Sequence, residues 1–354
     1  MKIGLFGLPK SGKTTLFNAL TGSDAPINSF SPKVEPNISI VRVLDQRIDF
    51  LSQMYNPKKT TYATLEIVDV AGIQGDALRQ ESFSGELMRI IRNVDALAIV
   101  VRGFDSDLEG EPAIEADLKT IEEELFLSDM IVLEKRLERI KEGHKKGKKS
   151  DLSIAEEELI ERCLAHLNDH PSLRDMEFSA ADLQIIRGFQ LFTLKPALVI
   201  VNTDESRYGK NDAVIGTVSQ LHRTVEFAGN FEMELSRLDA EEAKLFMDDM
   251  NITESARSRL STLAYEILGY ISFFTVGSDE VRAWNITGGA TAVTAAGAIH
   301  SDLARGFIAA ECFSYNDLRE LGSEKAIREQ GKFRLVGKDY IVVDGDILNI
   351  RFNV

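Results

Sequence analysis

The segment Gly7-Leu8-Pro9-Lys10-Ser11-Gly12-Lys13-Thr14, close to the N-terminus, has the form G-x-x-x-x-G-K-[S/T]. An apolar run from Lys2 to Phe6 precedes it and predicts a β-strand, and the residues from Thr14 to Leu20 predict a helix. A loop between a strand and a helix presents its backbone N–H groups and the helix N-terminus to an anion. The segment therefore predicts a phosphate-binding loop in an α/β fold.

The residue types of this loop suit a nucleoside triphosphate. The Lys13 ammonium would reach the β- and γ-phosphate oxygens, and the Thr14 hydroxyl would ligate Mg²⁺. Glycine at positions 7 and 12 lets the backbone approach where a Cβ atom would clash. The nucleotide-binding residues predicted in this loop are Gly7, Pro9, Lys10, Ser11, Gly12, Lys13, Thr14 and Thr15. The alternative is a glycine-rich turn that carries Lys-Thr by chance.

A second nucleotide element is Asp69-Val70-Ala71-Gly72, which follows an apolar strand from Ala63 to Asp69 and has the form D-x-x-G. Asp69 would hold the Mg²⁺ through water, and the Gly72 amide would bond the γ-phosphate. The next residue is Ile73, where small GTPases carry the glutamine that orients the attacking water. Gln74 is one position out of register, so a surface glutamine is the favoured interpretation and the catalytic residues stay unknown.

A third element, Asn202-Thr203-Asp204-Glu205, follows the apolar strand from Ala197 to Val201, where a GTPase carries Asn-Lys-x-Asp. The aspartate of that motif accepts hydrogen bonds from guanine, and a site built for those donors rejects a base that lacks them. Glu205 and Thr203 replace the aspartate and the lysine, which weakens the case for guanine. A plain turn at the end of a strand is the alternative.

The order of apolar and charged runs predicts three parts. Strands at Ile38–Val43, Ala63–Val70 and Ala96–Val101 alternate with helices, which is typical of an α/β domain. The charged helical run from about Glu115, the Gly143–Lys149 turn and a capping box at Ser153 and Glu156 predict a helical hairpin. The predicted bounds are 1–114 and 190–271 for a discontinuous nucleotide domain, 115–189 for the inserted hairpin and 272–354 for a last α+β domain.

The last domain is rich in strands and glycine. A helical run from Ser255 to Ile271 precedes it, and it ends in two apolar runs around Asp344-Gly345, which predict a β-hairpin. Trp284 and His300 in this domain could be considered for a catalytic role. We interpret them as packing or capping residues instead.

Composition narrows the function. The chain has 354 residues with 41 Lys+Arg against 56 Asp+Glu, a net charge of −15, which disfavours indiscriminate binding to nucleic acids. The two cysteines, Cys163 and Cys312, have neither disulfide-scaffold nor zinc-site spacing, and the N-terminus reads as a strand rather than a signal peptide. We expect a cytoplasmic protein. Eight basic residues against three acidic ones between Leu133 and Lys149 form one local exception, and the lysines at its end are candidates for RNA contact: Lys145, Lys146, Lys148 and Lys149.

Together these elements resemble the YchF/Obg-like ATPase family, a divergent branch of the translation-factor-related P-loop GTPases. The resemblance covers nearly the whole chain and is most specific near the C-terminus. It includes Val34-Glu35-Pro36-Asn37, Phe274-Thr275-Val276-Gly277, Glu280-Val281-Arg282-Ala283-Trp284, Gly289-Ala290-Thr291-Ala292, Ala295 to Asp302, Gly337-Lys338-Asp339-Tyr340 and Phe352-Asn353-Val354.

This resemblance implies an α/β P-loop G domain with an inserted α-helical coiled-coil hairpin, and a C-terminal α+β TGS domain of the ubiquitin-like β-grasp type. It also implies an enzyme that hydrolyses ATP in preference to GTP through Asn202 and Glu205, with Ala228 and Gly229 in the loop beside the base. Mg²⁺ is the implied cofactor, and the ribosome is the implied partner in translation or stress regulation.

The sequence departs from that family where catalysis is expected. Lys33 stands where a threonine usually precedes Glu35, Ile73 replaces the glutamine, and no histidine occurs between Asp105 and Glu115. We therefore expect a nucleotide-switch ATPase with a low intrinsic rate. One alternative is a true GTPase of translation, and another is a ribosome- or RNA-binding module that binds nucleotide with negligible hydrolysis.

Overall fold

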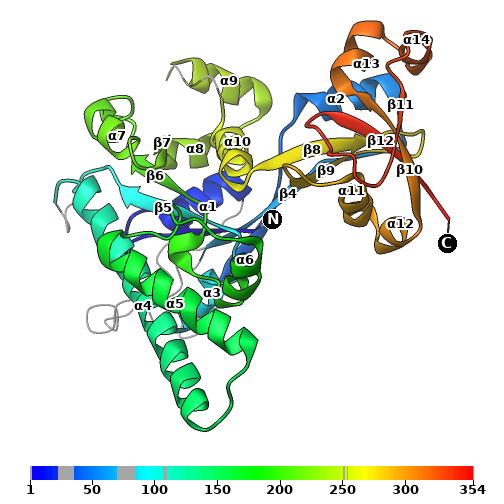
Figure 1. Ribbon diagram of the computed structural model, residues 1–354. Coiled ribbons are helices and arrows are strands. Elements are labelled where there is room, and N and C mark those ends of the chain that lie inside the picture. The colour runs from blue at the N-terminus through cyan, green and yellow to red at the C-terminus, as the bar shows by residue number, and fades with distance from the viewer. Residues whose placement is uncertain are drawn as a thin grey trace. The chain divides into compact units, whose positions relative to one another are not determined.

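The computed structural model describes residues 2–22, 36–69, 85–106, 110–249, 252 and 254–353 (Figure 1). The contacts divide the chain into two compact units. The first unit contains Met1–Ser39 and Glu66–Ala256, and the second contains Ile40–Leu65 and Arg257–Val354. In the described part of the chain, no helix is long and apolar enough to cross a membrane.

A six-stranded sheet with the order β2-β4-β1-β5-β6-β7 forms the centre of the first unit. The chain runs parallel in β4, β1, β5, β6 and β7, as the alternating pattern predicts. All seven residues of β5 are buried, which confirms the strand expected from its apolar sequence. The strands are β1 (Lys2–Phe6), β2 (Asn37–Arg42), β4 (Thr64–Asp69), β5 (Ala96–Arg102), β6 (Ala197–Thr203) and β7 (Arg223–Ala228).

Helices cover this sheet because each buries one apolar stripe. The first turns of α4 place Ile114, Leu118 and Ile121 in the same core as Leu97 and Ile99 of β5. The helices of the first unit are α1 (Lys13–Thr21), α3 (Gly85–Ile91), α4 (Ile114–Lys145), α5 (Asp151–Asp169), α6 (Ala180–Ile186), α7 (Asp212–Val218), α8 (Gly229–Leu235) and α9 (Ala240–Asp249), with the short 3₁₀ turns η2 (Arg187–Phe189) and η3 (Phe192–Leu194).

The predicted helical hairpin is present, and α4 and α5 lie side by side in Figure 1. Leucine and isoleucine side chains from both helices form its core, as their spacing predicts. The capping box is not at Ser153 and Glu156. Ser150 is the N-cap and Ser153 closes the box, because the helix begins at Asp151, three residues before the predicted start. The division by contacts groups the hairpin with the first unit.

A second six-stranded sheet, with the order β11-β10-β12-β8-β9-β3, forms the other unit. β8 and β9 are antiparallel, β12 and β8 are parallel, and α11 packs against the sheet, which is a β-grasp arrangement. The strands are β3 (Lys59–Thr61), β8 (Tyr270–Thr275), β9 (Glu280–Thr287), β10 (Phe307–Ser314), β11 (Arg334–Val336) and β12 (Asp346–Phe352). The helices are α2 (Gln46–Tyr55), α10 (Ala256–Leu268, which begins in the first unit), α11 (Ala292–Ile299), α12 (Ser301–Arg305), α13 (Tyr315–Leu321) and α14 (Glu324–Glu329).

The division by contacts assigns residues 40–65, which the sequence pattern places in the first domain, to the second unit, although the two ends of this segment belong to β2 and β4 of the first sheet. β3 pairs in parallel with β9, so that Thr60 lies opposite Val281. From α2, Arg47 forms an ion pair with Asp344 at 2.6 Å, and Tyr55 donates to Glu324 at 2.7 Å. These partners lie more than two hundred positions away, so local patterns did not indicate them.

The predicted β-hairpin around Asp344-Gly345 is wrong in its first half. The turn exists and β12 follows it, but residues 340–345 form no strand with β12. The buried Asp346 carboxylate instead accepts hydrogen bonds from the Tyr340 hydroxyl at 2.8 Å and from the Val343 N–H at 2.9 Å. These side-chain bonds replace the ladder that two apolar runs suggested. The helix before this unit is also shorter than predicted, because Tyr270 and Ile271 begin β8.

The residues expected to have plain structural roles have them. The His300 Nδ1 accepts the Asp302 N–H at 3.2 Å and caps α12, and the Trp284 indole donates to the Thr275 hydroxyl at 3.0 Å. Cys163 and Cys312 are both free and buried, and burial raises the pKa of each thiol to about 11. A thiol with such a pKa stays protonated near neutral pH, so neither cysteine is a reactive group.

Candidate functional site

The phosphate loop lies between β1 and α1, at the carboxyl end of the central strand pair. Gly12 is the N-cap of α1 and has φ +89°, a left-handed conformation that glycine adopts without strain. Ser11, Lys13 and Thr14 are buried, whereas Pro9 and Lys10 are exposed at the outer rim and Thr15 is half-buried in the helix. The loop therefore aims the N-terminus of a nine-residue helix at the space where phosphates would bind.

Glycine is required at positions 7 and 12 by the neighbouring strands. A Cβ atom on Gly7 would lie 2.2 Å from the Val100 carbonyl oxygen of β5. A Cβ on Gly12 would lie 1.9 Å from the Asn202 side-chain nitrogen at the end of β6. The two glycines thus let the loop rest directly on β5 and β6, in addition to any approach to phosphate.

The Lys13 ammonium lies inside the loop. Its Nζ donates to the carbonyl oxygens of Gly7 at 3.1 Å and Leu8 at 2.7 Å, which uses two of its three donors. Burial lowers the pKa of Lys13 to about 8, and the negative charge of Asp69 opposes this shift. The charge of Asp69 does not fully offset the loss of hydration that burial imposes on the Lys13 ammonium. A bound polyanion such as a triphosphate would stabilise this ammonium.

Thr14 and Asp69 come together as the sequence predicts for a metal site. The Thr14 hydroxyl donates to Asp69 Oδ2 at 3.1 Å, and both residues are buried. A carboxylate this close to the Thr14 hydroxyl could accept a hydrogen bond from a water on a Mg²⁺ that Thr14 ligates, which is the arrangement predicted for Asp69. The described residues contain no group of three His, Cys, Asp or Glu side chains that could hold a metal ion.

Asn37 is a neighbour of this pair that has no predicted role. Its side-chain amide donates to the same Asp69 Oδ2 at 3.4 Å. Asn37 begins β2 and ends the Val34-Glu35-Pro36-Asn37 segment. The Glu-Pro-Asn pattern was the available signal, but only the pairing of strands shows which carboxylate the amide meets.

Asn202 joins the phosphate loop to the predicted base loop. Its Nδ2 donates to the Ser11 carbonyl oxygen at 3.0 Å, and its Oδ1 accepts the Gly229 N–H at 3.1 Å. Asn202, Ala228 and Gly229 are all buried, and a Cβ on Gly229 would lie 2.3 Å from Asn202 Oδ1. The structure therefore brings together three of the four residues predicted for the base side.

Glu205, the fourth predicted residue of the base side, is exposed on the turn after β6. The turn is shaped by Asp204, which accepts the Arg207 N–H at 3.0 Å, while the Arg207 guanidinium binds both carboxylate oxygens of Asp105 at 2.6 Å. This ion pair, in which the one Nη2 atom contacts both carboxylate oxygens, ties the loop after β6 to the loop after β5 and raises the pKa of Arg207. Sequence patterns gave no sign of the Arg207–Asp105 pair.

Several predicted positions lie outside the described residues: Lys33, Gly72, Ile73 and Gln74. One loop residue has an unusual environment, because the Ser11 hydroxyl is buried without a hydrogen-bond partner in the described part of the chain.

We expect nucleotide binding to be coupled to proton uptake near pH 8. Because burial lowers the pKa of Lys13 to about 8, half of the free protein has a neutral lysine at that pH. Phosphate charge raises the pKa again, so binding at pH 8 should take up as much as about half a proton, falling to about a tenth at pH 7. Titration calorimetry of Mg²⁺–nucleotide in two buffers with different ionisation enthalpies measures this uptake.

The same pKa shift has a defined sign for stability. A lysine whose folded pKa lies below its unfolded value of 10.5 destabilises the fold below pH 8, and this cost disappears as the pH rises from about 8 to 10.5. In the two-buffer calorimetry of nucleotide binding, an enthalpy that is the same in both buffers at pH 8 would contradict the assignment of Lys13 as the titrating group.

Comparison with known proteins shows relatives with a nucleotide-binding domain and a C-terminal domain in the same order. Residues 2–136 match the family described as "50S ribosome-binding GTPase", and residues 270–353 match the YchF-GTPase C-terminal family, described as a protein of unknown function. The "Ribosome-binding ATPase YchF" of Haemophilus ducreyi is 36% identical over 367 residues, covering 100% of this chain and 99% of the relative. The protein of the same name from Bacillus subtilis is 35% identical over 363 residues, covering 99% of each.

A solved structure is similar over the whole length. The Schizosaccharomyces pombe protein described as a YchF GTPase superposes with a TM-score of 0.83 and 31% sequence identity, covering 99% of this chain and 97% of that one. Both units are therefore shared with this relative, including the inserted hairpin and the β-grasp domain.

Proposed function

Because the chain belongs to the YchF family, we propose that it is a nucleotide-switch ATPase, which binds ATP with Mg²⁺, hydrolyses it slowly and associates with ribosomes in the cytoplasm. The observation that carries this proposal is the meeting of Lys13, Thr14 and Asp69 at the end of β1 and β4. A charged donor, a hydroxyl and a carboxylate at this point are the parts that hold a triphosphate.

Different residues of the site bind different parts of the nucleotide. The N-terminus of α1 and the loop N–H groups receive the phosphates, and Lys13 neutralises part of their charge. Thr14 and Asp69 would hold Mg²⁺, which supplies further positive charge toward the β- and γ-phosphate oxygens. Asn202 fixes the phosphate loop against the base loop at Gly229, so the ends of the nucleotide are held in one rigid frame.

Positioning of the attacking water is the weak part of this machinery. Ile73 and Lys33 provide no group that orients water, and the sequence from Asp105 to Glu115 has no histidine. We therefore expect these differences from the family pattern to impair hydrolysis more than nucleotide binding.

We expect intrinsic ATP hydrolysis well below about 1 s⁻¹, the low end of typical enzymes, and an increase when ribosomes are added. A partner would supply the missing group or order the loops around the γ-phosphate. Steady-state phosphate release with and without ribosomes, at two salt concentrations, measures both quantities. Fast turnover by the isolated protein would contradict the first expectation, and a rate that ribosomes leave unchanged would contradict the second.

The tip of the hairpin is the part of the first unit that we propose for contact with ribosomal RNA. Lys145, Lys146, Lys148 and Lys149 are all exposed around the turn between α4 and α5. Positive charges at such a tip release counterions from phosphate, so binding through them should weaken as the salt concentration rises. The salt dependence of the stimulation reports on this contact.

The second candidate function is a true GTPase. The Asn202 geometry is compatible with it, because this asparagine joins the phosphate loop to Gly229 through its side-chain amide. Base selection depends on the neighbouring acceptor, and here this is Glu205 on an exposed turn rather than a shorter aspartate. We therefore propose that adenine is preferred.

We expect ATP to compete better than GTP for the site, and Glu205→Asp to shift the preference toward guanine by restoring the shorter acceptor. Competition against a fluorescent nucleotide, with Asp212→Glu as a control for a carboxylate change on a nearby helix, measures both. If the wild-type protein binds GTP at least about tenfold more tightly than ATP, which is about 1.4 kcal/mol, the GTPase alternative is correct.

A third candidate is a ribosome-binding module that holds nucleotide without turning it over. The missing water-positioning groups favour it. Ribosome binding that depends on nucleotide, with no phosphate release even on ribosomes, would identify this case.

A further inference from the structure

A cavity of about 320 Å³ lies in the first unit, between the loop after α3 and the foot of the hairpin. Its walls come from residues 92–95, which lead into β5, and from residues 186–196, which lead into β6. Because β5 and β6 are parallel and the nucleotide loops follow their carboxyl ends, this cavity lies at the opposite edge of the sheet. Its volume is at the lower end of the range for small-molecule sites.

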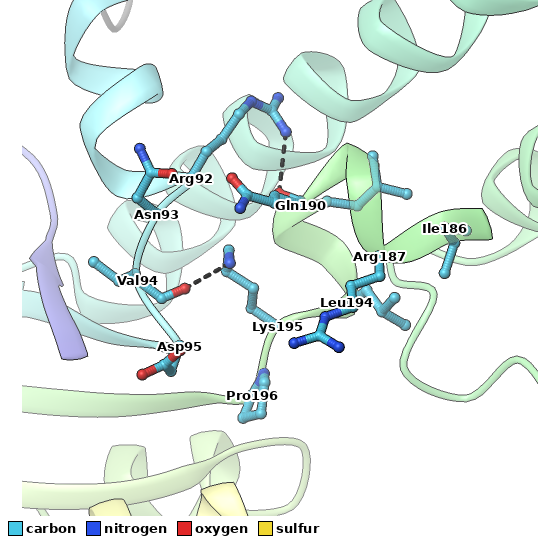
Figure 2. A pocket seen from close by; sticks show the side chains of 11 residues that line it. Arg92, Asn93, Val94, Asp95, Ile186, Arg187, Gln190, Leu194, Lys195 and Pro196 are labelled. Atoms are coloured by element: carbon cyan, nitrogen blue, oxygen red, sulfur yellow. Dashed lines mark hydrogen bonds between the residues drawn. The ribbon is translucent and has the colours of Figure 1, made fainter. Parts of the chain in front are cut away.

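Cationic side chains face this cavity from both walls (Figure 2). Arg92 and Lys195 are half-buried, and Arg187 is exposed and reaches in from the end of α6. The carboxylate that lines the cavity is that of Asp95, which already accepts the backbone N–H of Lys2 at 2.7 Å. Arg92 is also paired with the buried Asp129 carboxylate at 3.2 Å, so the three cations exceed the two nearby carboxylates by one charge, in a chain whose net charge is −15.

Two of the three cations are held in fixed positions. The Arg92 guanidinium lies 4.3 Å from the ring centre of Phe192 and donates to Ser128 Oγ at 2.7 Å and to the Gln190 carbonyl oxygen at 3.2 Å. The Lys195 ammonium donates to the Val94 carbonyl oxygen at 2.6 Å, and two of its donors are left for a ligand. Groups that are already positioned lose little freedom when they bind a ligand.

Arg187 is the adjustable member of the set. Among the residues that the structure describes, its side chain has no hydrogen bond or ion pair, and its planar fork of N–H donors suits a phosphate. Burial lowers the pKa of Lys195, because its ammonium is partly removed from water without full compensation. An anion beside these two side chains would supply that compensation.

The remaining wall suits a small polar body. The amide side chains of Asn93 and Gln190 offer hydrogen bonds, and Ile186, Leu194 and Pro196 provide apolar surface. We propose that this cavity is a second ligand site, which binds a small phosphate monoester through Arg187 and Lys195. Such a ligand would touch both the segment that follows α3 and the foot of the hairpin, and so it would stiffen the base of the hairpin.

The test uses the full-length protein with its nucleotide site saturated by Mg²⁺ and a non-hydrolysable ATP analogue. Calorimetric titration with ribose 5-phosphate should then still show binding, whereas ribose should show none. Arg187→Gln should weaken this binding by about tenfold or more, because it removes charge-assisted hydrogen bonds to the phosphate. Arg223→Gln, an exposed arginine at the start of β7, is the matched control and should leave the affinity unchanged.

The outcomes distinguish a small phosphate monoester from the phosphates of a nucleic acid as the ligand. Binding of ribose 5-phosphate that Arg187→Gln leaves unchanged would overturn the proposal, and so would its absence at millimolar ligand. A short RNA without a terminal phosphate is the second probe. If this RNA binds in a way that depends on Arg187 while ribose 5-phosphate does not bind, the site serves nucleic-acid phosphates and the small-ligand assignment is wrong. Saturation by the ATP analogue is measured first, so failure of the nucleotide site is seen separately.

Discussion

Replacing Lys13 by alanine should abolish tight binding of both ATP and GTP. The ammonium is buried in the phosphate loop and is held by the carbonyl oxygens of Gly7 and Leu8, directly beside the helix N-terminus. Its charge-assisted bonds to phosphate are worth about 1.5–3 kcal/mol, so the affinity should fall by between about tenfold and more than a hundredfold. Titration calorimetry with each triphosphate in the presence of Mg²⁺ measures the loss.

The control for this variant is Lys244→Ala. Lys244 is an exposed lysine on α9 in the same unit, so its replacement removes the same charge far from the loop. Thermal unfolding of both variants without nucleotide shows whether the fold is intact. Unchanged affinity of Lys13→Ala for both triphosphates would refute the assignment of the phosphate loop.

Replacing Asp129 by alanine should cost about 3–5 kcal/mol of unfolding free energy. Asp129 is fully buried at the base of the hairpin, where it accepts the Thr193 N–H at 2.7 Å, the Thr193 hydroxyl at 2.9 Å and the Arg92 guanidinium at 3.2 Å. Alanine leaves a buried N–H and a half-buried guanidinium without their acceptor. Urea unfolding followed by far-ultraviolet circular dichroism measures the change.

Two further variants test the cause of this loss. Asp175→Ala replaces an exposed aspartate in the loop after α5 and should change the unfolding free energy by less than about 0.5 kcal/mol. Asp129→Asn keeps one side-chain acceptor and should be less destabilising than alanine. If Asp129→Ala behaves like Asp175→Ala, the buried network does not stabilise the base of the hairpin.

The position of Asp129 matters because Arg92 directly follows α3. This one arginine contacts Ser128 and Asp129 of α4 and the Gln190 carbonyl oxygen in the segment that follows η2. These two segments form the base of the hairpin. These bonds fix the hairpin to the chain that leads into β5, in addition to the packing of the first turns of α4 in the core of the sheet.

The sequence determined the parts of the protein that depend on neighbouring residues. A strand, a glycine-rich loop and a helix occur within about twenty consecutive residues, so the motif itself specified how the phosphate loop and α1 follow β1. The buried character of β5 and the helical hairpin followed in the same way, because strand and helix periods are local properties. The order of these elements was enough to indicate the α/β class.

Contacts between distant residues were decided by the tertiary structure alone. Asn202 meets Ser11 across 191 positions, and Lys59–Thr61 pair with β9 in the second unit. A shorter-range contact also depended on packing: the buried Asp346 carboxylate binds Tyr340 and Val343, six and three positions away, in place of the expected strand pairing. In each case a local pattern specifies what one segment can form, whereas its partner is chosen by how the sheets and helices pack, because buried polar groups must find acceptors and donors wherever the fold places them.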